Sequence, residues 1–407
     1  MYRIDGERTP GFKLFLAILV GLALTIPLVS VYLLAYDRES QSREASRSIT
    51  AGWGGPQVMT GPELVIPYRT TVSETAIENG RSVTRTNEVK RELTLVPEIV
   101  RLSTKIAPDV RKRSIYTAVL YDAKVAGKAR FAFPPDLART GVQLEQMDLS
   151  RAELRFGLSD PRGLGANPQV SAGGQPLRLQ PGGGSTGNGR GFFAWIDAGT
   201  LPTHAIVVDF DYGFRGNASL SLAPAAGDTR WTVESTWPHP SFVGGFLPDP
   251  GKSVGPDGFK AAYSVGNLAL GHSLVSTGDA GAPAPVVAPR ASPYGEAVSA
   301  GEDSNVAQID LIQPVDLYSQ VNRAVKYGFL FIGFTFLALL MFDVIGGVRV
   351  SPVEYLLMGA ALVLFFVLLL AFAEVIGFTF AYVVASAAIA GLNTAYSAAV
   401  LSSWGRA

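Results

Sequence analysis

The longest apolar stretch of the chain occupies its C-terminal end, from Tyr327 to Leu401, with a short polar break around Glu354. A bilayer core is about 30 Å thick and is crossed by about 20 apolar residues per helix. As a single helix, Tyr355–Leu401 would be roughly 70 Å long at about 1.5 Å per residue, so it must fold back. Glu374 and Gly377 together indicate the turn. The pattern predicts three membrane-spanning helices, at about residues 325–346, 353–373 and 376–398.

A fourth apolar run lies near the N-terminus, at about residues 14–35. A cleaved signal peptide is the alternative, but its apolar region is usually about 7–15 residues long and ends at a small-residue site of the Ala-x-Ala type. This run is longer, and Leu33-Leu34-Ala35 is a poor cleavage site. We therefore predict a retained transmembrane helix, which together with a cytoplasmic tail forms residues 1–39. Pro27 predicts a kink in this helix.

Basic residues in the short flanks predict the orientation. Arg3, Arg8 and Lys13 precede the first span, Arg349 lies between the second and third, and Arg406 follows the fourth. If the spans alternate in direction, all of these fall on one side, which the positive-inside rule makes cytoplasmic. The prediction is a multi-pass inner-membrane protein with a cytoplasmic N-terminus. Its middle, residues 40–322, would lie in the periplasm of a Gram-negative bacterium, and residues 323–407 would hold the last three helices.

The middle of the chain consists of short apolar runs, several alternating at period two, separated by Gly- and Pro-rich turns. Such spacing is typical of an antiparallel all-β domain, here a large sandwich-like one or two stacked β lobes. The expected fold class is thus an α+β membrane protein with a β-rich periplasmic insert. Expected strands are Glu63–Tyr68, Glu92–Pro97, Ser114–Val125, Lys128–Phe133, Ala152–Leu158, Ala205–Tyr212, Asn217–Ala223, Thr229–Ser235 and Gly258–Val265.

Three local features of this middle part are also expected. A hairpin turn is predicted across Ala126-Gly127. Surface loops are predicted for Gly163–Gly191 and Ser276–Gly301, which are rich in glycine and in alanine and proline. A helix is predicted from Asp310, with Asp316 as a cap, that continues into the second span.

Composition and motifs argue against several chemistries. The 34 basic residues balance the 34 acidic ones, whereas proteins that bind nucleic acid carry a basic surplus, and the chain has no cysteine. Gly183–Gly187 matches G-x-S-x-G but lacks the flanking strand and helix, and Gly245–Ser253 has one residue too many for a phosphate-binding loop. The three histidines are far apart in sequence. No catalytic, cofactor-binding or metal-binding residue is therefore predicted, and no cofactor.

The densest cluster of aromatic residues and prolines is Trp237, Pro238, His239, Pro240 and Phe242. One interpretation is a rigid loop whose rings plug the β core. The other is a recognition loop, because aromatic side chains held by prolines lose little entropy on binding.

Distinctive stretches follow one another over nearly the whole chain: Gly54–Pro56, Gly61–Pro67, Arg113–Ala118, Ser159–Gly165, Ser235–Phe242, Gly245–Pro248, Val315–Ser319, Lys326–Tyr327, Pro352–Leu357 and Glu374–Phe378. In sequence and in order they resemble the CreD family of inner-membrane proteins. Members usually continue past the equivalent of Trp404 with another apolar pair of helices, whereas this chain stops at Ala407, so the resemblance implies either a truncated chain or a shorter branch of the family. It also raises the recognition interpretation of Trp237–Phe242 to parity with the plug.

The resemblance implies a role in cell-envelope integrity and stress, with no established enzymatic activity. The first hypothesis is a non-enzymatic inner-membrane protein whose β domain senses or binds an envelope component. Its partners would be the lipid bilayer and envelope components or other inner-membrane proteins. The alternative is a transport or lipid-handling protein, which needs a polar path lined by Asn393 and Thr335; Asn393 is otherwise explained by a helix–helix hydrogen bond. A periplasmic hydrolase is a third reading and would need a carboxylate pair or a Ser-His arrangement in a cleft.

Overall fold

The chain divides into two compact units, each with its own set of elements. The structure, a computed structural model, describes residues 10–50, 52–78, 81–113, 116–184, 189–277, 305–311, 317–345 and 351–401. The helical unit comprises Met1–Ala45 and Pro314–Ala407, and the β unit comprises Ser46–Gln313. An N-terminal apolar helix, a large central β region and a set of C-terminal apolar helices together confirm the predicted fold class.

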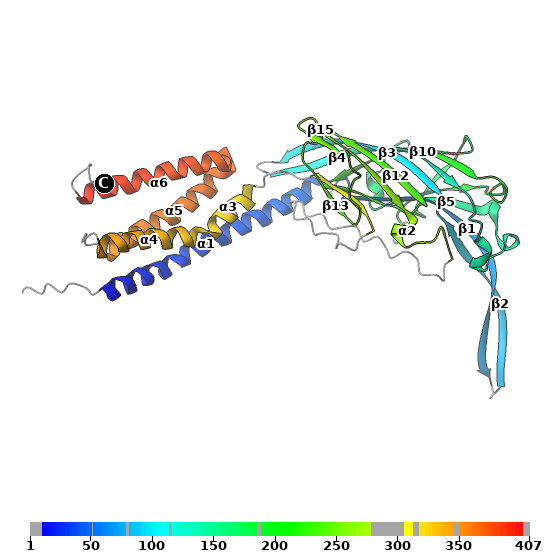
Figure 1. Cartoon of the computed structure of the whole chain (residues 1–407), viewed down its shortest axis with the longest axis horizontal. Coiled ribbons are helices and arrows are strands. Elements are labelled where there is room, and N and C mark those ends of the chain that lie inside the picture. The colour runs from blue at the N-terminus through cyan, green and yellow to red at the C-terminus, as the bar shows by residue number, and fades with distance from the viewer. Residues whose placement is uncertain are drawn as a thin grey trace, which may run out of the picture. The chain divides into compact units, whose positions relative to one another are not determined.

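Long apolar helices make up the helical unit (Figure 1). Four segments are long and apolar enough to cross a membrane: Gly11–Ser42, Gln320–Met341, Pro352–Ile376 and Phe378–Tyr396. The first of them lies within α1, which contains Pro27 and continues through the polar residues after the apolar run. The helices are α1 (Pro10–Thr50), α3 (Leu317–Lys326), α4 (Gly328–Val344), α5 (Pro352–Ile376) and α6 (Phe378–Leu401).

Local chemistry explains where α5 begins and ends. Ser351 caps its start, because the Ser351 hydroxyl accepts from the Glu354 N–H and the Glu354 carboxylate accepts from the Ser351 N–H at 3.0 Å. Pro352 occupies the first turn, where its missing N–H has no intrahelical partner to lose. The helix ends at Gly377, whose φ of 79° lies in the left-handed region that favours glycine. Gly377 is therefore the turn between the last two spans, as the sequence indicated.

The β unit is a sandwich of two sheets. One sheet runs in the order β13-β17-β11-β1-β5-β9-β8, with β2 paired to β1 and β16 to β2. Its strands are β1 (Gln57–Glu78), β2 (Arg81–Leu95), β5 (Ala152–Leu158), β8 (Leu179–Pro181), β9 (Gly191–Ile196), β11 (Ser219–Ala223), β13 (Pro240–Gly244), β16 (Val275–Thr277) and β17 (Ala307–Leu311).

The second sheet runs in the order β14-β15-β12-β3-β4-β10-β6-β7. Its strands are β3 (Ile99–Arg113), β4 (Tyr116–Phe131), β6 (Gln169–Ala172), β7 (Gln175–Pro176), β10 (Ile206–Asn217), β12 (Asp228–Ser235), β14 (Ser253–Gly255) and β15 (Gly258–Gly266), with the short helix α2 (Asn267–Leu270) after the last of them.

The inward faces of the two sheets share one hydrophobic core. In β12 and β15 buried and exposed residues alternate, as expected of strands with one face on the core. Phe156 of the first sheet stacks on Phe192 and meets the ring of Phe210 of the second sheet edge-on at 5.6 Å. Trp231 is fully buried, and its indole N–H donates to the Thr104 hydroxyl at 2.9 Å. This hydrogen bond satisfies the one polar atom of the Trp231 side chain inside the core.

The predicted hairpin at Ala126-Gly127 is wrong. Tyr116–Phe131 is one continuous strand, β4, paired along its length with β3 and with β10. Gly127 serves packing rather than a turn, because a Cβ there would lie 2.7 Å from the Arg101 carbonyl and against the ring of Phe210. A glycine inside a strand often marks such a close approach.

Two other expectations also need correction. Asp310 belongs to a strand rather than to a helix, because β17 pairs with β11 on one side and β13 on the other. The helix begins at Leu317 and breaks at Tyr327, between α3 and α4; Asp316 lies outside the described residues. The segment Gly163–Gly191 holds the short strands β6, β7 and β8 rather than only loop, while most of Ser276–Gly301 lies outside the described residues.

Candidate functional site

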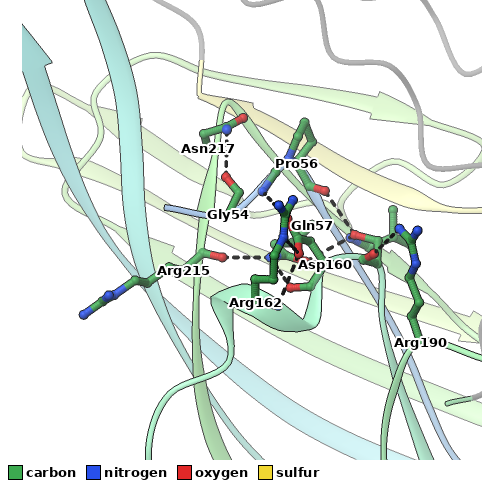
Figure 2. A network of polar contacts seen from close by, with 11 residues as sticks. Gly54, Pro56, Gln57, Asp160, Arg162, Arg190, Arg215 and Asn217 are labelled. Carbon is green, nitrogen blue, oxygen red and sulfur yellow. Dashed lines mark hydrogen bonds and ion pairs between the residues drawn. The ribbon is translucent and has the colours of Figure 1, made fainter. Parts of the chain in front are cut away.

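Two stretches far apart in sequence meet at the start of β1, around the side chain of Gln57. This side chain is fully buried and uses both ends of its amide (Figure 2). Its Nε2 donates to the carbonyls of Asp160 at 3.1 Å and Arg215 at 2.8 Å. Its Oε1 accepts from the Asp160 N–H at 3.1 Å and lies 3.2 Å from the Ser159 hydroxyl. A single side chain therefore links β1, the 159–165 loop and β10.

The Asp160 carboxylate holds the same loop in place. It accepts from the Gly55 N–H at 3.0 Å and pairs with the Arg162 guanidinium at 2.8 Å. The hydrogen bond from Arg162 is the main reason that the pKa of Asp160 lies below its ordinary value, with partial burial acting in the opposite direction. Asp160 consequently stays ionised at neutral pH and acts as an acceptor.

Further contacts complete this network (Figure 2). The Ser159 hydroxyl accepts from the Val58 N–H at 2.9 Å, and Asn217 donates to the Gly54 carbonyl at 2.8 Å. Gly163 has no room for a side chain, since a Cβ there would collide with the Arg215 carbonyl. We call Gly54–Gln57 with Ser159–Gly163 and Arg215–Asn217 the loop network. It fixes the backbone after Asp160 against β10.

A charged groove lies next to the loop network. It has a volume of about 1010 Å³, and the 162–169 segment forms one wall. The backbone of this wall is tied to β10 by the Gly165 N–H, which donates to the Gly213 carbonyl at 2.7 Å. The floor is made of small residues on the outer face of the central strands, Ala107 and Gly213. Charged and polar residues line the sides: Lys105, Asp122, Lys124, Arg162, Asn167, Gln169, Asp211 and Arg215.

The charges of this groove are arranged as cross-strand pairs. Lys124 lies 3.4 Å from Asp211, and Arg215 lies 3.5 Å from Asp122. Lys105 pairs with Glu234 of β12 at 3.0 Å. All these pairs are solvent-accessible, so each contributes little to stability and its members can exchange partners with a ligand. The groove therefore suits a polar ligand that carries both signs of charge.

Trp53 stands beside this region between two cations. The Cζ atoms of Arg111 and Arg215 lie 4.2 and 4.4 Å from its ring centroid. Its indole N–H donates to the Tyr121 carbonyl at 3.3 Å. This cation–π arrangement holds Arg215, which is also a groove residue, in place.

The predicted recognition loop is only partly at the surface. Trp237 is 9% exposed and belongs to the core cluster, and its indole N–H donates to the His239 carbonyl at 3.1 Å. Pro240 and Phe242 lie in β13, the edge strand next to β17. Phe242 is half-buried against Phe259, with ring centroids 5.7 Å apart.

The two aromatic rings of this loop thus point toward the core, which agrees with the plug interpretation. His239 is exposed, and Pro238 and Pro240 are half-buried. Lys252 lies 5.0 Å from the centroid of the Phe242 ring. A recognition role for Trp237–Phe242 stays a prediction.

The remaining motifs are placed as follows. Ser253, at the end of the P-loop-like stretch, begins strand β14 rather than a helix. Ser185 of the G-x-S-x-G match lies outside the described residues. Within the described part of the chain, no group of three or more His, Cys, Asp or Glu side chains could hold a metal ion.

The two residues predicted to line a transport path are not brought together. Asn393 lines a groove of the helical unit, whereas Thr335 does not line it and donates to the Phe331 carbonyl of its own helix at 2.8 Å. Glu374, the isolated charge of the last apolar stretch, lies 4.0 Å from Arg38 of α1.

The chain matches a known protein family over nearly its whole length. The family described as "Inner membrane protein CreD" matches residues 9–407. This chain belongs to the CreD family. The Inner membrane protein CreD of Escherichia coli (strain K12) is 29% identical over 388 residues, which is 94% of this chain and 80% of that protein. Family membership and the four apolar segments together make this chain a membrane protein.

The solved structures that align with this CreD-family chain do so only weakly. An M1 zinc metallopeptidase from Deinococcus radiodurans aligns with a TM-score of 0.21 and 9% identity. The alignment covers 41% of this chain and 38% of that one, so the chain spans less than half of that enzyme. A mutant of the same enzyme gives a TM-score of 0.22 and 8% identity. Likeness at this level carries no argument about fold or activity.

Two of the three segments of the loop network carry a signal in the sequence. Gly54–Pro56 and Ser159–Gly165 are separate stretches of the family resemblance, and nothing in the sequence indicates that they meet. Each combines glycine and proline with a polar residue, which is the composition of a backbone held by side-chain hydrogen bonds. The groove residues gave no signal, because Lys105, Asp122 and Arg215 come from three strands that only the sheet register brings together.

Proposed function

We propose that this CreD-family chain is a non-catalytic inner-membrane protein of envelope integrity and stress response. Its β unit would lie in the periplasm and bind an envelope component in the charged groove. The observation that carries the proposal is the groove itself, about 1010 Å³ with paired charges on its sides and a floor of small residues. Binding sites of small molecules generally have volumes of about 300–1,000 Å³.

The chemistry of the groove supports one class of envelope component. Lys124 and Arg215 offer cationic groups, and Asp122 and Asp211 offer carboxylates, all within one groove. Stem peptides of peptidoglycan carry both ammonium and carboxylate groups on a sugar backbone, so they can exchange partners with both kinds of pair. The small floor leaves room for an extended backbone. We therefore infer that the ligand is a peptidoglycan fragment.

The test is calorimetric binding of a soluble disaccharide–tetrapeptide to the full chain in detergent. Lys124→Glu should weaken binding by at least tenfold, because it places a like charge beside Asp211. Lys90→Glu is the matched control, since Lys90 is exposed on β2 away from the groove, and it should bind as the wild type does. Equal affinities for all three proteins would contradict the groove proposal. Cleavage of the fragment during the titration, detected by mass spectrometry, would contradict a non-catalytic role.

A further inference from the structure

A second groove lies within the helical unit. It has a volume of about 620 Å³ and is bounded by α3, α4, α5 and α6. Its middle is aromatic and apolar, with Phe331, Phe365, Phe366 and Tyr382 among the lining side chains. Apart from its ends, the groove therefore resembles the interior of a bilayer in polarity.

The two ends of this groove differ in chemistry. One end is lined by Gln320 and Arg323 of α3 and by Tyr327, which directly follows α3. Because α4 and α6 are both antiparallel neighbours of α5, the N-terminal ends of α3 and α6 lie at the same end of the unit. Asn393 lines the opposite end, in the last turn of the span Phe378–Tyr396.

The dimensions fit one chain of a lipid. Phe378 and Asn393 both line the groove and are fifteen residues apart on α6, which is roughly 22 Å along a helix at about 1.5 Å per residue. One acyl chain spans a single leaflet, which is half of an apolar bilayer core about 30 Å thick, so the groove is long enough to hold one chain. Arg323 is exposed at the beginning of the span Gln320–Met341, where headgroups lie.

The groove has a positive charge at one end and apolar walls beyond it. This combination suits an amphiphile with an anionic headgroup. A guanidinium has five N–H donors in a planar fork that matches a phosphate, so Arg323 can bind a phosphate alongside another partner. Gln320, about one turn before Arg323, and Tyr327, about one turn after it, add donors on either side. A partner helix fits less well. It is about 10–12 Å wide with its side chains, and α3 packs directly against both α5 and α6 at this end.

We propose that this groove binds one anionic phospholipid, with the phosphate at Arg323 and Gln320 and an acyl chain along α5 and α6 toward Asn393. The assignment is independent of the function proposed for the β unit. The bound lipid would fill the space between α6 and α4, beyond the point where α3 packs against α6.

Native mass spectrometry of the full chain in detergent tests this assignment. The chain is titrated with phosphatidylglycerol and with phosphatidylcholine of identical acyl chains. We expect at least a fivefold preference for phosphatidylglycerol. Arg323→Gln should abolish the preference, while Lys326→Gln should retain it, because Lys326 is exposed one turn away and does not line the groove.

A second variant separates the acyl site from the headgroup site. Ala390→Phe places a ring in the groove, so it should reduce binding of both lipids by about the same factor; circular dichroism and gel filtration verify that the variant is folded. Equal binding of the two lipids by the wild type would overturn the proposal. So would an equal effect of Lys326→Gln and Arg323→Gln. A dimer mass that Ala390→Phe removes would assign the groove to a second copy of the chain instead.

Discussion

At the scale of single residues, the buried Gln57 side chain binds three backbone groups of the β unit. Gln57→Leu keeps an apolar volume there but removes the partners of two carbonyls and one N–H. A buried polar group left without a partner costs about 1–3 kcal/mol. We expect the β unit to lose about 3–5 kcal/mol of stability, measured by urea unfolding of the full chain followed by tryptophan fluorescence. Four of the five tryptophans, Trp53, Trp195, Trp231 and Trp237, lie in the β unit and dominate this signal.

Gln175→Leu is the control for this loss. Gln175 is exposed on the edge strand β7, so the same substitution there should change stability by no more than about 0.5 kcal/mol. If both variants unfolded at the same urea concentration, the hydrogen bonds of Gln57 would not be what holds the 159–165 loop.

Glu63 predicts a pH dependence of the β unit. Burial raises its pKa from an ordinary value of 4.5 to about 7, and the charge of Arg155 opposes the rise. Arg155 is already engaged by Glu92 and Glu153 at 3.0 and 2.8 Å. The folded state therefore holds the Glu63 proton more tightly than the unfolded state, so stability falls as pH rises from about 4.5 to 7.

Glu63→Gln removes this titration. The variant should match the wild type near pH 4 and be more stable at pH 8, by on the order of 3 kcal/mol, since one pKa unit is about 1.4 kcal/mol. Urea unfolding at both pH values measures the difference. A variant that is less stable than the wild type at pH 8 would show that the Glu63 carboxylate is favourably paired there.

At the scale of elements, α1 and α5 approach each other at Gly359, where α5 has no side chain. A Cβ on Gly359 would collide with the Leu24 side chain and lie 3.0 Å from the Phe336 ring. Gly359→Ala should lower the midpoint of SDS unfolding, followed by helical circular dichroism, by the equivalent of about 1–3 kcal/mol. Adding Leu24→Ala should recover part of that loss, because the collision is with the end of the leucine side chain.

Gly333→Ala in α4 provides a matched control for this contact. No atom lies within 4 Å of a Cβ at Gly333, so the change should be neutral or stabilise the helix by up to about 1 kcal/mol. Equal losses for Gly333→Ala and Gly359→Ala would mean that the contact with Leu24 is not what requires a glycine at position 359.

Elements were predictable where one physical rule acts alone. The apolar runs revealed the four long helices because a span needs about 20 apolar residues in succession, and Gly377 revealed a turn. The predictions were wrong where contacts with distant parts of the chain override the local pattern. Gly127 resembled a turn because the ring of Phe210, which forces the glycine, is 83 positions away in the chain. Asp310 resembled the start of a helix because its strand is defined by neighbours β11 and β13.

At the scale of the whole molecule, neither groove could be found from sequence. The charged groove depends on register across β3, β4 and β10, which places Lys124 opposite Lys105 and Gly213. The groove of the helical unit depends on how α3 and α6 pack on α5. In both cases the lining residues form no motif in the sequence. They make a groove only because the fold places them on the same face of neighbouring elements.

Orientation in the membrane is the property on which the proposed function rests, and cysteine labelling tests it directly. The chain contains no cysteine, so a single introduced thiol is the only reactive one. Leu268→Cys lies in the β unit at a residue that is 92% exposed, and Gly11→Cys lies at the start of α1 with nothing within 4 Å of its Cβ. With basic residues before the first span held in the cytoplasm, a membrane-impermeant maleimide added to spheroplasts should label residue 268 at once. Residue 11 should react only after permeabilisation. The reverse pattern would place the charged groove in the cytoplasm, where no peptidoglycan polymer could reach it.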